Sequence, residues 1–193
     1  MKLLRIWLLL SILLSATAFA QHVELGVFAN YSHIDQPNTV INLVGVGGRA
    51  DFNLVRILQL ELESAYDFKY PHVTSIQQQN GIIVDVSKLG ILHANAGLKV
   101  QTRGGSFFAF VKGGVNQYRT EAQVQTLIAT PTSITTVQLP DRNYMKGILY
   151  PGAGVGFHAG PLGIRLDVGD EIAWINGSAN HSLRVTFGPT LRF

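Results

Sequence analysis

The chain has 193 residues and no cysteine, and its 15 Lys and Arg residues exceed its 12 Asp and Glu residues by three. The lack of cysteine excludes a disulfide scaffold, and this small net charge gives no reason to expect a nucleic-acid partner. Lys2 and Arg5 account for most of the excess, because without them the chain has 13 basic and 12 acidic residues.

The first 20 residues have the three parts of a secretory signal peptide. Lys2 and Arg5 form a basic region, residues 6–14 are apolar, and Ala18-Phe19-Ala20 is an A-x-A cleavage site. The apolar run is shorter than the roughly 20 residues that a membrane-spanning helix needs. We therefore predict that residues 1–20 are removed and that residues 21–193 form a single exported domain.

Alternation of apolar and polar residues predicts eight strands in the rest of the chain. The clearest lies in 57–68, where Leu, Leu, Leu, Ser and Tyr at even positions alternate with Gln, Glu, Glu, Ala and Asp at odd positions. No stretch after Gln21 is apolar enough for a membrane-spanning helix. The 20 glycines and the strongly β-branched segments predict an all-β fold. The predicted strands are 22–32, 43–53, 57–68, 87–100, 107–118, 143–158, 163–173 and 182–193.

The connections between these strands alternate in length. Outer-membrane barrels have short periplasmic turns and longer extracellular loops, and an alternation of this kind places every long connection at one end of an up-and-down barrel. The long ones here are 33–42, 69–86, 119–142 and 174–181, and the short ones are 54–56, 101–106 and 159–162. Candidate aromatic girdles flank them: Phe52, Phe107, Phe157 and Phe193 near the turns, and Tyr31, Tyr66, Tyr144 and Trp174 near the loops.

Two of the long connections contain hairpin signals. Asn80-Gly81 is typical of a type I′ turn, and β-prone residues precede and follow it, so strands three and four are predicted to continue as a protruding hairpin. The connection 119–142 has a similar pattern around Thr130-Pro131-Thr132. For this second segment a polar loop without regular structure is an equally good interpretation.

The last eight residues, Thr186 to Phe193, have the pattern polar, any, Gly, two spacers, apolar, any, aromatic. This pattern resembles the C-terminal signal strand of bacterial outer-membrane barrels, and the resemblance implies that Gly188, Leu191 and Phe193 form the signal read by the barrel assembly machinery. Pro189 departs from a regular strand, because proline cannot donate a ladder hydrogen bond.

With the signal peptide and the strand pattern, the mature chain resembles the small outer-membrane barrels that include the OmpA transmembrane domain, OmpX and Ail. The resemblance implies an eight-stranded antiparallel up-and-down transmembrane β-barrel in the outer membrane, in contact with membrane lipid and lipopolysaccharide. We expect a monomer whose loops contact an extracellular partner.

Periodicity alone does not say which face of the strands points inward. A soluble lipocalin-like barrel would have the same alternation with apolar residues inside. The membrane arrangement is favoured by the many glycines on the polar face, by the small number of Lys residues, six in the whole chain, and by the terminal aromatic Phe193.

If the polar face is interior, charges of both signs line the lumen. Register estimated from the predicted turns places Arg49 opposite Glu61 and Glu171 opposite Arg184. Eight strands enclose a space that side chains just fill, so we predict a lumen plugged by ion pairs, with a narrow pore as the alternative.

The polar residues do not form a convincing catalytic or metal-binding constellation. His181 and Ser182 lie in the predicted outer rim, but adjacent strand residues point to opposite faces and cannot act as base and nucleophile. We therefore expect no enzyme activity, cofactor or metal, with a lipid A-modifying enzyme as the weaker alternative. The expected function is a structural or surface-adhesion role in the cell envelope.

Overall fold

The computed structural model describes residues 23–36, 39–78, 81–104, 106–130, 133–137, 141–175 and 177–193. The predicted signal peptide and the cleavage site before Gln21 lie outside these residues. Over the described ranges, no helix is long and apolar enough to cross a membrane.

Nine antiparallel strands make up almost all of the described chain. Eight of them match the eight predicted strands in order, and β6 is an additional short strand. They are β1 Val23–Gln36, β2 Thr39–Val55, β3 Leu58–Gln78, β4 Gly81–Gln101, β5 Phe107–Thr130, β6 Ser133–Val137, β7 Arg142–Ala159, β8 Leu162–Ile175 and β9 Ser178–Arg192.

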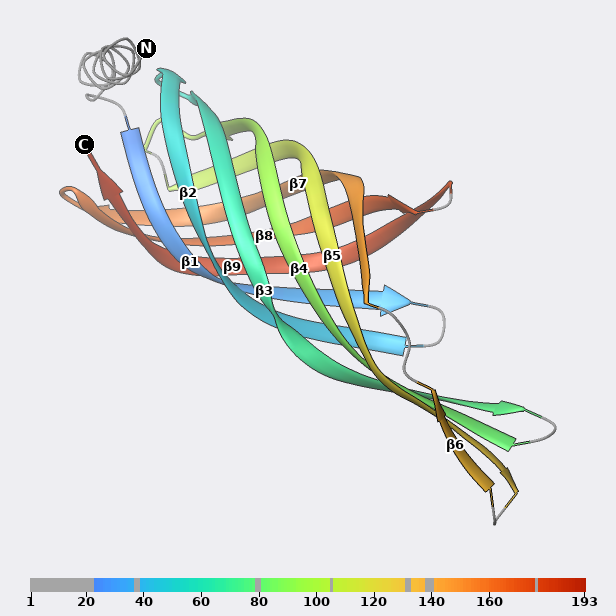
Figure 1. The fold of residues 1–193 in the computed structure, drawn as a ribbon. Helices are drawn as coiled ribbons and strands as arrows, with labels where there is room; N and C mark the ends of the chain where they lie inside the picture. The colour runs from blue at the N-terminus through green and yellow to red at the C-terminus, as the bar shows by residue number, and fades with distance from the viewer. Residues whose placement is uncertain are drawn as a thin grey trace, which may run out of the picture.

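The eight long strands close into a barrel. The order β4-β3-β2-β1-β9-β8-β7-β5 is completed by pairing of β4 with β5, so no barrel strand is left with a free edge within the wall. β1 pairs with the last strand, β9, and the start of β1 and the end of β9 lie at the same end of the barrel, which we call the periplasmic end (Figure 1). The predicted up-and-down topology is confirmed.

The alternation of side chains places charge inside and apolar groups outside. On β3, Glu61 is fully buried whereas the neighbouring Leu62 is 43% exposed. On β8, Arg165 and Asp167 are buried, and the residues between and beside them are apolar and exposed. Because a soluble barrel would have the reverse arrangement, the lipocalin-like alternative is wrong.

Aromatic residues gather at both ends of the apolar outer wall. Phe107, Phe157 and Phe193 are exposed at the periplasmic end, and Tyr31, Tyr144 and Trp174 are exposed at the opposite end. Such girdles mark the two membrane–water interfaces of outer-membrane barrels.

Several inward-facing glycines make room for aromatic rings in the crowded lumen. A Cβ atom at Gly47 would lie 2.3 Å from the ring of Phe28, and one at Gly154 would lie 2.3 Å from the ring of Phe108. At Gly97 a Cβ would lie 2.1 Å from the main-chain oxygen of Val111, because the neighbouring strand passes close by. The predicted role of glycine in a narrow interior is therefore confirmed.

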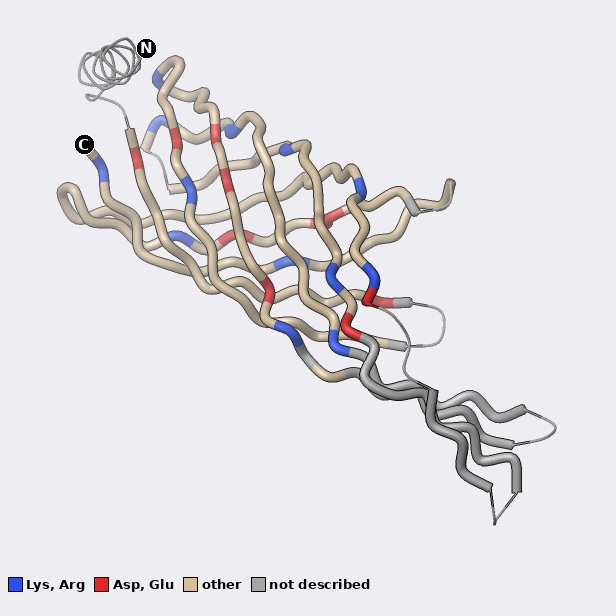
Figure 2. Tube along the Cα trace, viewed as in Figure 1, with Lys and Arg blue, Asp and Glu red and all other residues tan. Residues whose placement is uncertain are grey.

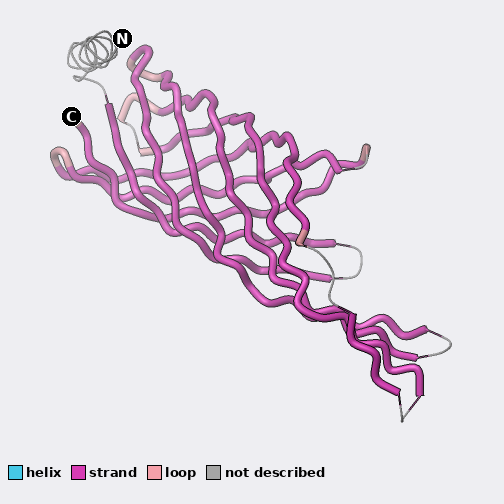
Figure 3. Tube along the Cα trace, viewed as in Figure 1, coloured by secondary structure: helices cyan, strands magenta, loops and turns pink. Residues whose placement is uncertain are grey.

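The strands are longer than predicted at the end opposite the termini. β3, β4, β5 and β6 continue beyond the barrel as one protruding sheet, with Gln78 paired to Gly81 and Thr130 to Ser133 (Figures 1 and 3). The hairpin predicted at Asn80-Gly81 is confirmed for its flanking strands, and the second segment is also a hairpin. The turn residues 79–80 and 131–132 lie outside the described residues. The expected loops 33–42 and 174–181 are largely strand.

Two prolines interrupt the barrel ladder. Between β1 and β9 the pairs that would join Val27 to Pro189 and Phe28 to Gly188 are missing, although pairing is regular on both sides of the gap. Between β7 and β8 the pairs that would join Tyr150 to Glu171 and Pro151 to Asp170 are missing in the same way. Proline lacks the N–H that a ladder pair requires, so the departure predicted at Pro189 is confirmed.

The charged lumen and the protruding sheet

The centre of the lumen is a cluster of two carboxylates and three cations. Lys112 on β5 donates to both Glu61 and Glu63 of β3, each with an N–O distance of 2.6 Å. Arg165 Nη2 on β8 lies 2.8 Å from Glu61 Oε2, and Arg184 Nη1 on β9 lies 2.9 Å from Glu63 Oε1. All of these side chains are almost fully buried.

A second layer lies on the periplasmic side of this centre. Arg165 also bonds Asp51 at 2.9 Å and Asp167 at 2.7 Å, so one guanidinium joins three carboxylates. Asp51 pairs in addition with Lys99, and Asp167 with Arg49.

The third layer, toward the protruding sheet, is built around His93 on β4. Its Nε2 lies 3.1 Å from Asp67 Oδ2 and its Nδ1 lies 3.1 Å from Glu171 Oε2. Ser32 also donates to Asp67, at 2.8 Å. Only an imidazolium can donate to both carboxylates at once, so this geometry favours the charged form of His93.

The three layers are balanced in charge. Six carboxylates, Asp51, Glu61, Glu63, Asp67, Asp167 and Glu171, face five cations, Arg49, Lys99, Lys112, Arg165 and Arg184, and protonated His93 is the sixth. Glu24 is separate and pairs with Arg192 at the periplasmic end. Since buried charges persist only when they are paired, this balance explains how a charged lumen can be closed.

Aromatic rings provide further contacts for the cations. The guanidinium of Arg49 lies 4.3 Å from the ring centre of Phe28, and that of Arg165 lies 4.3 Å from Phe108. Lys112 Nζ lies 4.3 Å from the ring centre of Phe110. Cation–π contacts of this kind stabilise a desolvated charge.

The four residues predicted as lumen ion pairs are all buried inside the barrel, but their partners differ from the prediction. Arg49 lies opposite Glu63, not Glu61, and pairs with Asp167 across the lumen. The predicted Arg49–Glu61 pair is therefore wrong. The β2–β3 turn lies at Arg56-Ile57, one residue later than expected, and the pairing is irregular between Asn53 and Val55. Because a hairpin pairs residues symmetrically about its turn, a turn that is one residue later moves the partner of Arg49 by two residues.

The other predicted pair shows the opposite displacement. Glu171 lies opposite Ser182 and Arg184 opposite Gly169, because the β8–β9 hairpin turns one residue earlier than expected. Arg184 nevertheless reaches Glu171 diagonally, with 3.5 Å between Nη1 and Oε2.

Sequence reasoning missed Lys99, Lys112, Asp167 and His93 as members of the network. Their position on the polar face of each strand was the available signal. Most of their partners lie on strands that are not neighbours in the wall, as for Lys112 on β5 and Glu61 on β3; the exception is Asp67 on β3, which pairs with His93 on the neighbouring β4. Strand register does not give the contacts that cross the lumen.

Three of the carboxylates could in principle hold a metal ion. Oxygen atoms of Glu61, Glu63 and Asp167 lie within 4.8 Å of one another. Each of these carboxylates already has a cationic partner, namely Lys112, Arg165 or Arg49. The local chemistry is therefore that of an ion-pair network.

The predicted assembly-signal residues lie in β9 or directly after it. Gly188 is buried and faces the lumen, where a Cβ would lie 2.0 Å from the main-chain oxygen of Val27. Leu191 and Phe193 point outward and are exposed, and the Phe193 N–H donates to Val23 at 2.9 Å.

The protruding sheet has two strand edges that are not covered within the described residues. The last pair between β2 and β3 is Gly45 with Asp67, so β3 beyond this point pairs only with β4. β6 pairs only with β5. The unpaired N–H and C=O groups of such edges can accept another strand.

Lys69, Lys88, Arg119 and Arg142 lie on β3, β4, β5 and β7 near the base of this sheet, and we call them the basic collar. Figure 2 shows Lys and Arg segments in this region, together with Asp and Glu segments. Glu121 accepts a hydrogen bond from Lys69 and lies opposite Lys88. The bond with Lys69 holds the pKa of Glu121 below its ordinary value, and the pKa of Lys69 is raised by the same bond.

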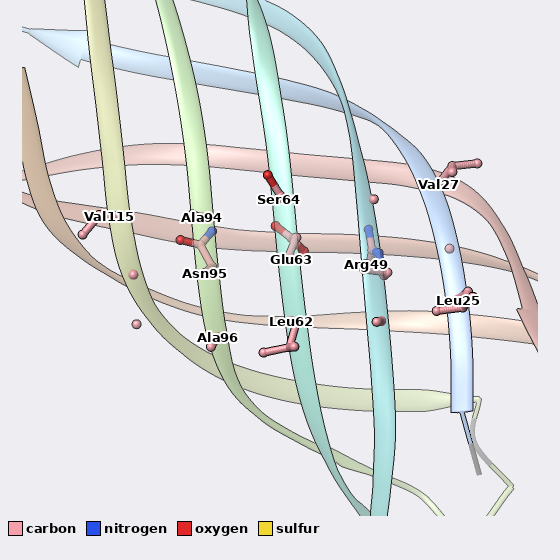
Figure 4. A pocket seen from close by; sticks show the side chains of 15 residues that line it. Leu25, Val27, Arg49, Leu62, Glu63, Ser64, Ala94, Asn95, Ala96 and Val115 are labelled. Carbon is pink, nitrogen blue, oxygen red and sulfur yellow. The ribbon is translucent and has the colours of Figure 1, made fainter. Parts of the chain in front are cut away.

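The outer wall has a shallow dent of about 790 Å³ across β1 to β5 (Figure 4). Register aligns small residues there, since Gly48 lies opposite Ser64, and Ser64 lies opposite Ala94. The surface of the dent is almost entirely apolar, which suits contact with acyl chains.

No protein-family model and no curated protein matches the chain. Solved structures with the same fold include Ail, the attachment invasion locus protein of Yersinia pestis, crystallised with the heparin analogue sucrose octasulfate. It is 12% identical, with a TM-score of 0.56 over 89% of this chain and 98% of that chain. Neisserial surface protein A is 11% identical, with a TM-score of 0.50 over 89% and 97% of the two chains. The chain therefore has the fold of small eight-stranded outer-membrane barrels.

Proposed function

We propose that the protein is an integral outer-membrane barrel that acts at the cell surface through its protruding sheet, with a closed lumen and no enzymatic activity. The observation that carries this proposal is the combination of an apolar, aromatic-bordered outer wall with a buried interior in which carboxylates and cations form ion pairs. A wall of this kind is stable only in lipid. The long strands beyond the barrel then extend away from the membrane on the side opposite the termini.

Membrane insertion depends on the two ends of the chain in this proposal. Residues 1–20 direct export and are removed, and Gly188, Leu191 and Phe193 are read during assembly. The test is fractionation of expressing cells, together with migration of boiled and unboiled samples on gels. We expect the protein in the outer-membrane fraction, with a gel migration that changes on boiling. Deletion of Phe193 should reduce the folded fraction more than deletion of residues 176–177 from the β8–β9 connection. Recovery in the soluble periplasmic fraction would contradict the proposal.

The lumen is proposed to act as a structural plug and not as a channel. Glu61, Lys112 and Arg184 are fully buried at its centre and bonded to one another or to further charges, so ion passage would require their separation. Planar-bilayer recording of the folded barrel should give no steady conductance. A stable conductance that changes with Lys112→Met would support the narrow-pore alternative instead.

The partner is proposed to be anionic. The basic collar lies next to the outer aromatic girdle, where lipopolysaccharide carries its phosphates, and four cations there exceed Glu121 and Asp141 by two. Ail, which shares this fold, was crystallised with a sulfated heparin analogue, and this supports extending anionic-ligand binding to this chain. The free edges of β3 and β6 offer main-chain groups to an extended segment of a partner protein.

Removal of the β3–β4 part of the protruding sheet tests this surface role. A variant in which 71–87 is replaced by a two-residue turn should remain a folded barrel but lose binding to lipopolysaccharide-coated or host-cell surfaces. A matched control shortens the β1–β2 hairpin at its outer end. Equal binding by both variants would contradict a role for the sheet.

Mass spectrometry of lipid A from expressing cells tests the absence of enzymatic activity. We expect unchanged lipid A, because the proposed function includes no lipid chemistry.

A further inference from the structure

Three cations and one carboxylate meet where the protruding sheet begins. Glu121 on β5 accepts a hydrogen bond from Lys69 on β3, and the register places it directly opposite Lys88 on β4. Arg119, two residues before Glu121 on the same strand, lies opposite Gly90 of β4. Since residues two apart in a strand share a face, Arg119 and Glu121 lie on the same side of the sheet.

Gly90 allows the lysine to cross the middle strand. A Cβ atom at Gly90 would lie 2.9 Å from Cγ of Lys69 and 3.3 Å from the hydroxyl oxygen of Tyr66, so both side chains pass close to this glycine. Lys69 thereby reaches from β3 across β4 to the carboxylate on β5. The bond with Glu121 raises the pKa of Lys69, and the nearby charge of Arg119 opposes this rise. The two cations and the carboxylate therefore act on one another.

The cluster lies at the outer membrane–water interface of the barrel. Lys69 directly follows Phe68, which is 47% exposed on the outer wall, and aromatic residues of this kind mark the interface. Lys69 and Arg119 are exposed, whereas Lys88 and Glu121 are half-buried. The headgroup region of the bilayer is at the same level, so the phosphate of a membrane lipid can approach the cluster from the side.

Glu121 already occupies the position that such a phosphate would take. Its bond with Lys69 has to break before an oxygen atom of a ligand can replace the carboxylate. A ligand with one negative charge replaces one monoanion with another and gains little. A phosphomonoester approaches two negative charges above pH 6 and has three acceptor oxygens, so it gains charge and can contact more than one cation at once.

We propose that Glu121 makes the basic collar selective for phosphomonoester groups of membrane lipids over lipids with a single negative charge. The phosphate displaces Glu121 from Lys69 and is bound by Lys69, Lys88 and Arg119. This inference rests on the proposed anionic partner of the collar. It adds the class of headgroup and the residue that selects it.

Retention of lipid is the first test. The chain is folded in phosphatidylcholine nanodiscs that contain equal amounts of phosphatidic acid, a phosphomonoester, and phosphatidylglycerol, a monoanionic diester. After release at pH 8 the retained lipid is measured by native mass spectrometry. We expect about five-fold more phosphatidic acid than phosphatidylglycerol, the factor that corresponds to one strong exposed ion pair. Equal retention of the two lipids would overturn the proposal.

Two variants and a matched control test the assigned roles. Glu121→Gln should reduce the preference to less than about two-fold, mainly through higher retention of phosphatidylglycerol, because the competing carboxylate is gone. Lys69→Gln should reduce the retention of phosphatidic acid. Asp35→Asn removes an exposed carboxylate from β1 at the same end of the barrel and should leave the preference unchanged. An unchanged preference in Glu121→Gln, or an equal change in Asp35→Asn, would refute the role of Glu121.

The pH dependence gives an independent readout. The second pKa of a phosphomonoester is about 6, so its charge falls toward one at pH 5. The bond with Lys69 holds the pKa of Glu121 below its ordinary value, and the charge of Lys88 acts in the same direction, so Glu121 keeps its charge at pH 5. The preference of wild type should therefore decrease to less than about two-fold at pH 5, and a preference that persists would contradict the charge argument.

The other charged groups around Glu121 are cations, with one exception. Lys69, Lys88 and Arg119 keep their charge between pH 5 and 8. On the side of β7, Arg142 lies opposite Thr120, and Asp141 directly precedes it in the chain. Asp141→Asn should retain the loss of preference at pH 5. A preference that no longer depends on pH in Asp141→Asn would assign the effect to Asp141 and overturn the role of the phosphate charge.

A soluble arm separates the lipid from a free phosphate ester. Glycerol 3-phosphate is titrated into the chain folded in neutral detergent, and the Nε–H signal of Arg119 is followed by NMR. Saturable binding without retention of phosphatidic acid would assign the site to a soluble ligand and overturn the lipid part. Every variant is first checked for heat-modifiable migration. A barrel that inserts but shows no preference contradicts this inference alone, whereas a water-soluble chain contradicts the proposed function.

Discussion

The bond between Lys112 and Glu61 offers the sharpest test of how the lumen is held together. Lys112 Nζ is 2.6 Å from Glu61 and 2.6 Å from Glu63, and all three side chains are buried. Lys112→Met preserves much of the packing against Phe110 but removes both charge-assisted bonds. Each such bond contributes about 1.5–3 kcal/mol to stability, which gives an upper bound of about 3–6 kcal/mol for the pair.

The remaining partners reduce this cost. After Lys112→Met, Glu61 keeps Arg165 and Glu63 keeps Arg184, so neither carboxylate is left as an isolated buried charge. We therefore expect a loss of about 2–4 kcal/mol in the free energy of unfolding. Removal of one partner from an isolated buried pair costs about 3–5 kcal/mol, so the expected loss is somewhat smaller. Glu61→Gln should cost a similar amount, because Arg165 retains Asp51 and Asp167.

Urea unfolding in lipid vesicles, measured for the two single variants and the double variant, reports the coupling directly. We expect a coupling energy of about 1–3 kcal/mol for Lys112 with Glu61, as for other residues in contact. The matched cycle combines Arg49→Met with Glu61→Gln. These two residues have no direct ion pair and are linked only through Asp167 and Arg165, so we expect a coupling energy smaller than that of Lys112 with Glu61. Strong coupling in the second cycle and none in the first would refute the register and the network described above.

Three further outcomes are expected. Gly97→Ala should lower the folded fraction on unboiled gels, because its Cβ would lie 2.1 Å from a main-chain oxygen, whereas Gly104→Ala, with nothing within 4 Å, should fold normally. An NMR titration should place the carboxyl pKa of Glu121 below its ordinary value in wild type and closer to that value in Lys69→Gln. Because the folded-state pKa is depressed, this bond contributes stability at pH values above the unfolded-state pKa and loses it as the pH falls through the folded value; the reverse shift would contradict the bond. Pro189→Val should restore one ladder hydrogen bond and raise the free energy of unfolding by about 1 kcal/mol, and a decrease would contradict the assigned gap.

The sequence was sufficient for the barrel because its information is local. Period-two alternation on β3 defines both the strand and the face that carries Glu61, and the alternating connection lengths define the topology. The outer ends of β1 and β2 were missed because the mostly polar residues in 33–36 are compatible with both loop and strand, whereas the turn signal at Asn80-Gly81 predicted the outer ends of β3 and β4.

Ion-pair partners were less predictable for a geometric reason. A hairpin register depends on the centre of its turn, and a displacement of a single residue moves Arg49 from Glu61 to Glu63. The contacts of Arg49 with Asp167 and of Lys112 with Glu61 join strands that are not neighbours in the wall. Whether these ion pairs form depends on the diameter of the barrel and on the aromatic rings and glycines beside the charged groups. Neither can be derived from the sequence of a single strand.

The two proline gaps have a mechanical consequence. β8 and β9 are continuously paired from Leu162–Leu191 to Ile175–Ser178, but this hairpin is joined to β7 across a ladder broken at Pro151 and to β1 across one broken at Pro189. Under a pulling force, a ladder with missing hydrogen bonds separates before a continuous one. The wall therefore has one weak seam on each side of the continuous β8–β9 hairpin. Under load this hairpin would separate from the barrel as a unit before its own strands come apart.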